Sequence, residues 1–453
     1  MTGGVQSLAR RRSLAGETLA TLALAFPLIA GQLGQMLISL ADTMMIGHLG
    51  VVPLGAATLA NSLTLVPLVF GLGLLTAVPV RVAQARGAGA PEEAGEVLRH
   101  GLVLAVVFSL LVIGVLGVLA GQLGRLGQPP EVAARTPVYL MLVAVSLLPA
   151  LMTAALKNHA DALERPWWPF WIMFAGVALN VLLNWIFIFG RLGIPAMGLE
   201  GAGIATLLAR VLVLIALGAW LLGDRRLADW RPARWRIPLR LARFRTLLKI
   251  GIPASLQQLV EVSAFSGGAL LVGLLGTLAL GAHQIALTCT ATAFMVPLGL
   301  AMAVTVRVGE VIGAGQRERL RRIIAGAWLL IAVFATVTMV VFITSGRAIA
   351  GGFVSEPEVI DLAVSLLVVA GIFQLVDGFQ VVCVGALRGA GDVVVPAWLC
   401  SLAYLGLGVP LGMVLMFGVG LGAVGFWCGL AGGLGAAALL LGWRCYRVLL
   451  RAG

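Results

Sequence analysis

Three carboxylates stand inside long apolar stretches of the sequence, where a charged side chain is costly to bury. They are Asp42, Glu261 and Asp377, whereas most of the 19 acidic residues fall in polar segments or at the ends of apolar ones. An ionised group at the centre of a bilayer costs at least about 2.5 kcal/mol, so such residues are rare and usually functional. A buried carboxylate can take up a proton, ligate Na⁺ or pair with an organic cation. The three residues therefore predict cation sites.

Glu261 and Asp377 are predicted to lie at one depth. Glu261 follows Lys249 by 12 residues, and Asp377 precedes Arg388 by 11. Because a helix rises about 1.5 Å per residue, both carboxylates lie roughly 17 Å from the inner membrane edge. Together they could share a proton, or hold Na⁺ and an organic cation in turn. Alternatively, each is protonated and only ties neighbouring helices together. Neutral polar residues nearby would complete the site: Gln257, Gln258, Gln284, Gln374 and His283.

Asp42 belongs to a second polar group nearer the outer end of its span, roughly 8 Å deep. Asn180 and Asn184 are four residues apart, so they share one face of a helix at a comparable depth, and Thr206 is similarly placed. One carboxylate with amide and hydroxyl oxygens suits a proton or a small hard cation. The alternative is that the Asn and Thr side chains only hydrogen-bond neighbouring helices.

Arg210 lies one helical turn from Thr206 on the same face, well inside an apolar run. If it points inward, it could pair with Asp42 and compete with a bound cation. Equally, it could stretch toward an interface or bond backbone carbonyls. The sequence leaves both possibilities open.

The elements that must position these residues are membrane-spanning helices. The chain has 453 residues, of which 60 % are hydrophobic and 11 % charged, and its mean hydropathy is +1.05. Soluble domains carry about 25 % charged residues, so most of this chain cannot face water. Twelve spans are predicted, at residues 19–47, 54–80, 100–122, 136–156, 167–190, 201–223, 247–275, 281–309, 323–344, 360–387, 394–417 and 421–443. We expect an all-α integral membrane protein.

The net charge of +12 is best explained by topology. With the N-terminus in the cytoplasm, most Lys and Arg residues fall on the cytoplasmic side, as the positive-inside rule requires. We therefore expect both termini in the cytoplasm, contact with membrane lipids and no nucleic-acid partner. The five cysteines are odd in number, confined to the second half and mostly embedded in apolar stretches, which excludes a secreted disulfide scaffold.

The chain is an internal duplication. When its two halves are aligned without gaps so that Pro27 meets Pro253, 22 of the 63 positions at 27–89 are identical. We call this pairing the repeat alignment. Because each half has six spans, we expect two parallel lobes related by a pseudo-two-fold axis along the membrane normal. The predicted domains are an N-lobe at 1–223, a basic cytoplasmic linker at 224–246 and a C-lobe at 247–453. Pro27 and Pro253 would bend equivalent helices and could gate a cavity; ordinary packing is the alternative.

The chain resembles the multidrug and toxic compound extrusion (MATE) family, and its NorM branch in particular. The resemblance runs from Phe26 to about Tyr446 and is carried by motifs in a fixed order, namely Pro27 to Asp42-Thr43 with Gly47, Leu156-Lys157 to Asp161, Asn180 with Asn184, Glu261-Val262, residues 281–287, Val306 to Gly309 and Leu387 to Asp392. It implies a V-shaped pair of six-helix lobes and efflux of cationic, amphipathic drugs driven by inward Na⁺ or H⁺. It also implies C-lobe carboxylates at Glu261 and Asp377.

By the same resemblance, Asp42, Asn180 and Asn184 match the N-lobe cation site, while Arg210 departs from the family pattern. We expect a monomeric multidrug antiporter of a bacterial inner membrane, without a cofactor or enzymatic activity. One rival is a related flippase for lipid-linked oligosaccharides, which would need many cationic residues in its cavity; beyond Arg210, none lies deep in a span. Another is a membrane-embedded prenyltransferase, which would need paired acid-rich motifs. The choice between Na⁺ and H⁺ stays open.

Overall fold

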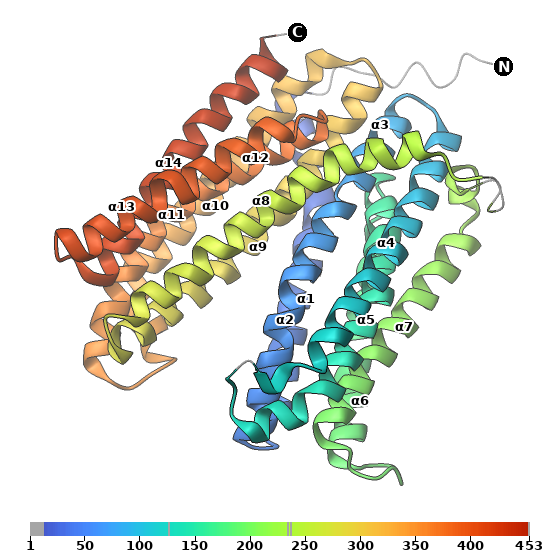
Figure 1. Ribbon diagram of the computed structural model, residues 1–453. Coiled ribbons are helices and arrows are strands. Elements are labelled where there is room, and N and C mark those ends of the chain that lie inside the picture. Colours follow the sequence, from blue (N-terminus) through green and yellow to red (C-terminus); the bar gives the residue numbers. More distant parts are fainter. Residues whose placement is uncertain (1–12, 126, 233–234, 236–237, 452–453) are drawn as a thin grey trace, which may run out of the picture. The chain divides into compact units, whose positions relative to one another are not determined.

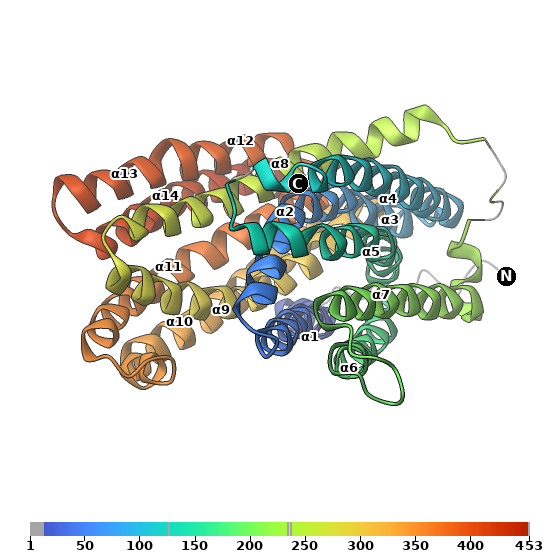
Figure 2. The same cartoon turned by 60° about the horizontal axis from the view of Figure 1, so that its bottom comes forward.

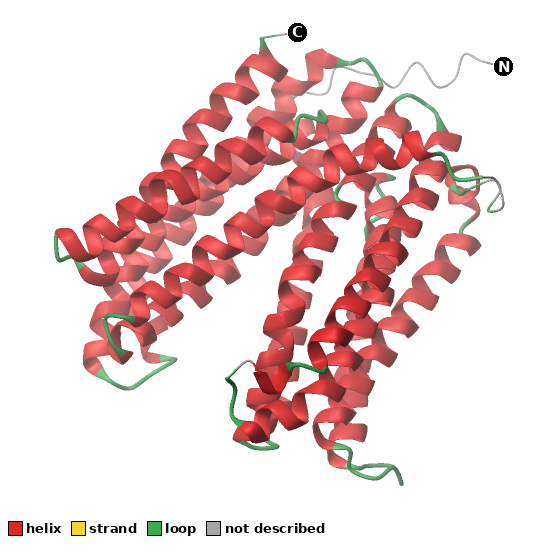
Figure 3. Cartoon of the chain, in the orientation of Figure 1, coloured by secondary structure: helices red, strands yellow, loops and turns green. Residues whose placement is uncertain are grey.

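The computed structural model describes residues 13–125, 127–232, 235 and 238–451. Within these residues the chain consists of helices joined by loops and contains no strand, so the predicted all-α class is confirmed (Figures 1 and 3). The long helices are α1 (Leu14–Gly47), α2 (Val51–Leu75), α3 (Ala77–Gly87), α4 (Pro91–Ala120), α5 (Pro130–Ala162), α6 (Trp167–Phe189), α7 (Gly198–Gly223), α8 (Leu241–Gly273), α9 (Thr277–Gly313), α10 (Leu320–Gly351), α11 (Pro357–Gly389) and α14 (Gly422–Cys445).

Short helical segments complete the chain. The last predicted span but one, 394–417, is built from α12 (Val394–Ser401), a π-helical stretch (Leu402–Gly408), α13 (Val409–Met413) and a second π-helical stretch (Val414–Gly418). Single 3₁₀ turns occur at Leu123–Arg125 and Arg317–Arg319, a six-residue 3₁₀ helix occurs at Arg225–Trp230, and a further π-helical stretch follows α14 at Tyr446–Leu450. The described part of the predicted basic linker, 224–246, contains this 3₁₀ helix at Arg225–Trp230, and the end of the predicted linker, from Leu241, is already part of α8.

Eleven helical stretches of the described chain are long and apolar enough to cross a membrane. The remaining predicted span, 247–275, corresponds to α8, which has 33 residues but is less hydrophobic because it carries Gln257, Gln258 and Glu261. Several helices run beyond the predicted apolar runs. For example, α4 begins at Pro91, although the apolar run begins near residue 100, because a polar first turn is compatible with a helix outside lipid.

Internal contacts divide the chain into two compact units. The N-unit comprises residues 30–259, and the C-unit comprises residues up to 29 together with those from 260 onward. Both boundaries fall inside long helices, within α1 shortly after Pro27 and within α8 shortly after Pro253. This division differs from the predicted lobes 1–223 and 247–453, because the first half of each of these helices packs with the unit formed mainly by the other half of the sequence.

The first halves of α1 and α8 make equivalent contacts in their respective units. In the N-unit, Gly73 of α2 approaches Ser255 of α8 so closely that an added Cβ would lie 2.5 Å from the Ser255 Cα. In the C-unit, Gly299 of α9 approaches Ile29 of α1, at 2.8 Å from an added Cβ. The repeat alignment relates both members of these two pairs. The duplication read from the sequence therefore extends to tertiary packing.

Two turns repeat with the same backbone geometry. Gly50 before α2 has φ 109°, and Gly276 before α9 has φ 106°. The repeat alignment also relates Gly89 and Gly315, whose φ angles are 65° and 70°. These left-handed conformations are accessible to glycine without a Cβ clash, which explains why glycine occupies both members of each pair.

Each unit is built around a central helix. In the N-unit, α5 packs against α2, α4 and α7, and α6 lies beside α7 (Figure 2). The buried core there includes Leu140, Leu147 and Ile188. In the C-unit, α11 packs against α9, α10 and α14, and α14 packs tightly against α13. The polar residues discussed below project from these central helices and their neighbours.

Candidate functional site

In the N-unit, Asp42 meets the two asparagines that the sequence placed near it. The Asn184 Nδ2 donates to the Asp42 Oδ1 at 2.5 Å and to the Asn180 Oδ1 at 3.3 Å. Both asparagines are buried on α6, whereas Asp42 on α1 is half-buried. The i and i+4 spacing on α6 places the two amides on one face, as expected. The remaining amide oxygen, Asn184 Oδ1, is buried and makes no hydrogen bond to the described residues.

Thr206 and Arg210 on α7 bond to other groups. The Thr206 hydroxyl donates to the backbone oxygen of Ala202 at 3.0 Å, within its own helix. The Arg210 Nη1 donates to the Ser146 Oγ at 2.8 Å and approaches the Ser146 backbone oxygen at 3.5 Å. Arg210 is close enough to Asp42 for their charges to interact. Arg210 therefore combines elements of both possibilities: its charge acts on Asp42, while its hydrogen bonds go to the hydroxyl and the backbone oxygen of Ser146.

Two members of this group were not predicted from the sequence: the aromatic residue Tyr139 and the polar residue Ser146. Tyr139 of α5 is buried, and its hydroxyl group interacts with the side chain of Asn61 and with the charges of Asp42 and Arg210. The chain contains only three tyrosines, which is the one signal in the sequence that could have singled out Tyr139. Ser146 gave no signal, because an isolated serine in a membrane helix is common.

In the C-unit, the predicted carboxylate pair comes together. Asp377 on α11 is 4 % exposed, and its charge interacts with that of Glu261 on α8. Gln374, three residues earlier on α11, donates from Nε2 to the backbone oxygen of Thr290 at 3.0 Å. The Gln374 Oε1 is buried and accepts no hydrogen bond from the described residues. Two carboxylates and a free amide oxygen thus provide acceptors for a positively charged group.

A tyrosine that the sequence did not single out lies beside this pair. The Tyr404 hydroxyl donates to the Gln380 Oε1 at 2.9 Å, and the Gln380 Nε2 approaches the Cys400 Sγ at 3.4 Å. The charges of Glu261 and Asp377 both act on Tyr404. Tyr404 is fully buried in the π-helical stretch after α12, a deviation from regular helix that often marks functional sites.

Aromatic rings extend from Tyr404 across the C-unit. Phe265 packs edge-on against Tyr404 and Phe373, with ring centroids 6.5 and 6.0 Å apart, and Phe373 packs against Trp427 at 5.9 Å. Such rings present negative faces that attract cations. The predicted site residue His283 joins this group, because the Trp427 Nε1 donates to its Nδ1 at 3.0 Å. That bond fixes the neutral ring with its proton on Nε2.

The remaining predicted C-lobe residues are placed differently. Gln284 on α9 is exposed. Gln257 and Gln258 lie on α8 just before the boundary at residue 259, so contacts group them with the N-unit, whereas Glu261 belongs to the C-unit. Pro27 and Pro253 lie inside α1 and α8, and neither proline ends its helix. The roles assigned to all of these residues stay predictions.

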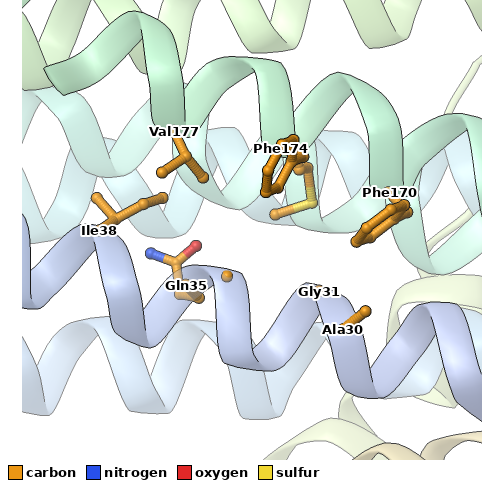
Figure 4. A pocket seen from close by; sticks show the side chains of 9 residues that line it. Ala30, Gly31, Gln35, Ile38, Phe170, Phe174 and Val177 are labelled. Carbon is orange, nitrogen blue, oxygen red and sulfur yellow. The ribbon is translucent and has the colours of Figure 1, made fainter. Parts of the chain in front are cut away.

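The N-unit also contains a pocket between α1 and α6 (Figure 4). Its walls include Phe170 and Phe174 of α6 and Ile38 of α1, and the side-chain amide of Gln35 points toward it. The repeat alignment places Gln35 at the position that Glu261 occupies in the second half. The N-unit therefore presents a neutral amide where the C-unit presents a carboxylate.

Comparisons with known proteins agree with one another. The MatE family model matches residues 27–186 and 253–414. The probable multidrug resistance protein NorM of Bradyrhizobium diazoefficiens is 39 % identical over 98 % of this chain and 96 % of its own length. Its counterpart in Mesorhizobium japonicum is 38 % identical over 94 % of this chain and 92 % of its own length.

Among solved structures, a mutant of the MATE transporter of Vibrio cholerae has the same fold, with a TM-score of 0.88. That match covers 97 % of this chain and 98 % of the other at 24 % identity. The family model covers more than half of the chain, and the relatives cover nearly all of it. The chain belongs to the MatE family, and it is therefore a multi-pass membrane transporter and not an enzyme.

Proposed function

We propose that this protein is a multidrug efflux antiporter that exports cationic, amphipathic compounds in exchange for inward H⁺ or Na⁺. The relatives named as multidrug resistance proteins support the drug-export part of this proposal. The observation that carries the mechanism is the carboxylate pair of the C-unit, Glu261 with Asp377, beside the rings of Tyr404 and Phe265. A hydrophobic cation needs both a counter-charge and apolar contact, and this group supplies both.

Exchange follows from competition for the same negative charge. An organic cation stays bound while Glu261 and Asp377 are ionised, because the ion pair is lost when the carboxylates lose their charge. When H⁺ or Na⁺ neutralises the pair from the outside, the cation loses its counter-charge and leaves. Alternating access then requires the two units to move relative to each other, and bending of α1 and α8 near Pro27 and Pro253 is the proposed gate.

The test is ethidium efflux from reconstituted vesicles, driven separately by a pH gradient and by a Na⁺ gradient. Wild-type protein should export ethidium with at least one gradient and not in the absence of both. Asp377→Asn and Glu261→Gln should each abolish export while the purified protein stays monodisperse in detergent. Unchanged transport by both variants would show that the carboxylate pair is not the coupling site. The same assay decides between Na⁺ and H⁺.

We also propose that the protein acts as a monomer in the bacterial inner membrane, with both termini in the cytoplasm and without a bound cofactor. The placement of basic residues in the sequence supports this orientation. The flippase alternative has less support, since Arg210, which lies inside an apolar helix of the N-unit, is hydrogen-bonded to Ser146. Cysteine labelling at the termini of inside-out and right-side-out vesicles would test the orientation.

A further inference from the structure

Arg210 is a permanent positive charge in the middle of α7, an apolar helix. Such a charge is expensive in a membrane span and usually has a functional reason. The side chain is held from α5, where the buried Ser146 accepts a bond from Nη1 at 2.8 Å. Ser146 is itself anchored, because its hydroxyl donates to the backbone oxygen of Val143 at 2.7 Å. The guanidinium is therefore fixed beside Asp42 by a partner other than Asp42.

Two oxygens of this group, one on Asp42 and one on Asn180, already accept from the same hydrogen-bond donor, whereas the Asn184 Oδ1 accepts none from the described residues. The Asn184 Nδ2 is directed at both the Asp42 Oδ1 and the Asn180 Oδ1. A hard cation needs several oxygen ligands, and an N–H group pointing at two of them occupies the place of the ion. The third candidate, Thr206, directs its hydroxyl proton to Ala202 of its own helix. The geometry around Asp42 is thus that of a hydrogen-bonded carboxylate.

The charge of Arg210 acts in the same direction. A positive charge that acts on Asp42 also repels a cation bound there, and this repulsion is stronger in the protein interior than in water. A bound Na⁺ at Asp42 would experience this repulsion from Arg210 in addition to the competition from Asn184. A proton is repelled by the same charge, but it differs from Na⁺ in needing only one carboxylate lone pair and no shell of ligands.

We propose that Arg210 is a specificity-determining residue that excludes Na⁺ from the polar site around Asp42. The inference deepens the proposed function, on which it rests for the idea that this site takes part in ion coupling. It assigns any Na⁺ bound by the protein to the carboxylate pair of the C-unit. The length of the arginine and its Ser146 anchor determine how near the positive charge lies to Asp42.

The test measures binding of ²²Na⁺ to the purified full-length protein, which does not depend on drug transport. The starting variant carries Glu261→Gln and Asp377→Asn, so that the C-unit pair cannot contribute. This variant should bind no saturable Na⁺. Adding Arg210→Met, which keeps an unbranched but shorter side chain and removes the charge, should create one saturable site with at least tenfold higher affinity than any residual binding. Arg210→Lys, which keeps the charge, serves as the matched control and should create none.

The new site must also depend on Asp42, so Asp42→Asn in the Arg210→Met background should abolish it. Saturable, Asp42-dependent Na⁺ binding in the starting variant would overturn the proposal, and so would the absence of a new site in a folded Arg210→Met variant. A second measurement needs no change at Arg210: in otherwise wild-type protein, Asp42→Asn should leave the number of bound Na⁺ ions unchanged, and a decrease would overturn the proposal. Failure of the wild-type protein to export ethidium would count against the proposed function and would leave these binding results interpretable.

Discussion

The two units share a scaffold but carry different chemistry. Around its acidic centre the C-unit has two carboxylates, Glu261 and Asp377, together with Tyr404 and neighbouring rings. The N-unit has one carboxylate, Asp42, bonded to an amide and lying near an arginine. The packing of α1 on α9 is nevertheless equivalent, under the repeat alignment, to the packing of α8 on α2. Duplication has therefore kept the contacts that build each unit and has left the polar centres free to diverge.

The position of the acids shows how far this divergence has gone. Under the repeat alignment, Glu261 of α8 corresponds to Gln35 of α1, and Asp42 of α1 corresponds to Gly268 of α8. The carboxylates of these two equivalent helices therefore lie seven positions apart in the alignment. Seven residues are about two helical turns, which keeps the side chain on a similar face and moves it roughly 10 Å along the helix. The acidic centres of the two units therefore do not lie at equivalent positions of the repeat alignment.

Ion pairs at the start of α1 predict the largest difference between the units. In the C-unit, Glu17 is 0 % exposed and pairs with Arg307 and with Arg319. Glu17→Ala should lower stability by about 3–5 kcal/mol, because Arg307 would be left buried without its counter-charge. In the N-unit, Arg81 pairs with Glu93, whose side chain is 39 % exposed, so Glu93→Ala should cost less than about 1 kcal/mol. The melting temperatures of the detergent-solubilised variants measure this difference.

Equal losses at the two sites would contradict this comparison. The repeat alignment pairs Glu93 with Arg319. The acidic residue of each ion-pair cluster therefore stands at a different aligned position, Glu93 in the N-unit and Glu17 in the C-unit. The double variant Glu17→Arg with Arg319→Glu reproduces the N-unit pattern in the C-unit. It should recover part of the stability that Glu17→Ala loses, and a double variant no more stable than Glu17→Arg alone would show that the two clusters are not interchangeable.

Glycine packing in the C-unit predicts an intermediate effect. A Cβ at Gly429 of α14 would lie 2.1 Å from the backbone nitrogen of Gly412 in α13. Gly429→Ala should therefore cost about 1–3 kcal/mol, since the backbone cannot move away as a flexible side chain could. Gly435 lies on the same helix with no atom within 4 Å of an added Cβ, and Gly435→Ala should not destabilise the protein. Thermal unfolding of the two variants under identical conditions decides; a melting temperature unaffected by Gly429→Ala would refute the close contact.

The smallest predicted effect concerns the contact between α8 and α2. The Ser255 Oγ donates to the backbone oxygen of Phe70 at 2.7 Å, whereas the equivalent position in α1 is the apolar Ile29. Ser255→Ala should destabilise the N-unit by about 1 kcal/mol. As a control, the Ser401 hydroxyl donates to Ala397 of its own helix, so Ser401→Ala should change the melting temperature less. If the control has the larger effect, the Ser255 bond does not contribute to packing.

Some features could be predicted because they are local in sequence. Hydropathy located the membrane helices, and the spacing of Asn180 and Asn184 placed both on one face beside Asp42. The depth argument brought Glu261 and Asp377 together. The partner of Arg210 could not be predicted, because Ser146, the single serine of α5, becomes its acceptor only through the way α5 and α7 pack. Tyr139 and Tyr404 were missed for the same reason.

By itself, the sequence determined the helices, the duplication and the carboxylates that remain in apolar surroundings, since each depends on residue types at short or fixed spacing. The tertiary structure decided which side chains meet. It also decided that the first halves of α1 and α8 pack with the unit formed mainly by the other half of the chain. The physical reason is that hydrophobic burial constrains every membrane helix alike, whereas close contacts such as Gly73 with Ser255 depend on the shapes of two particular helix faces.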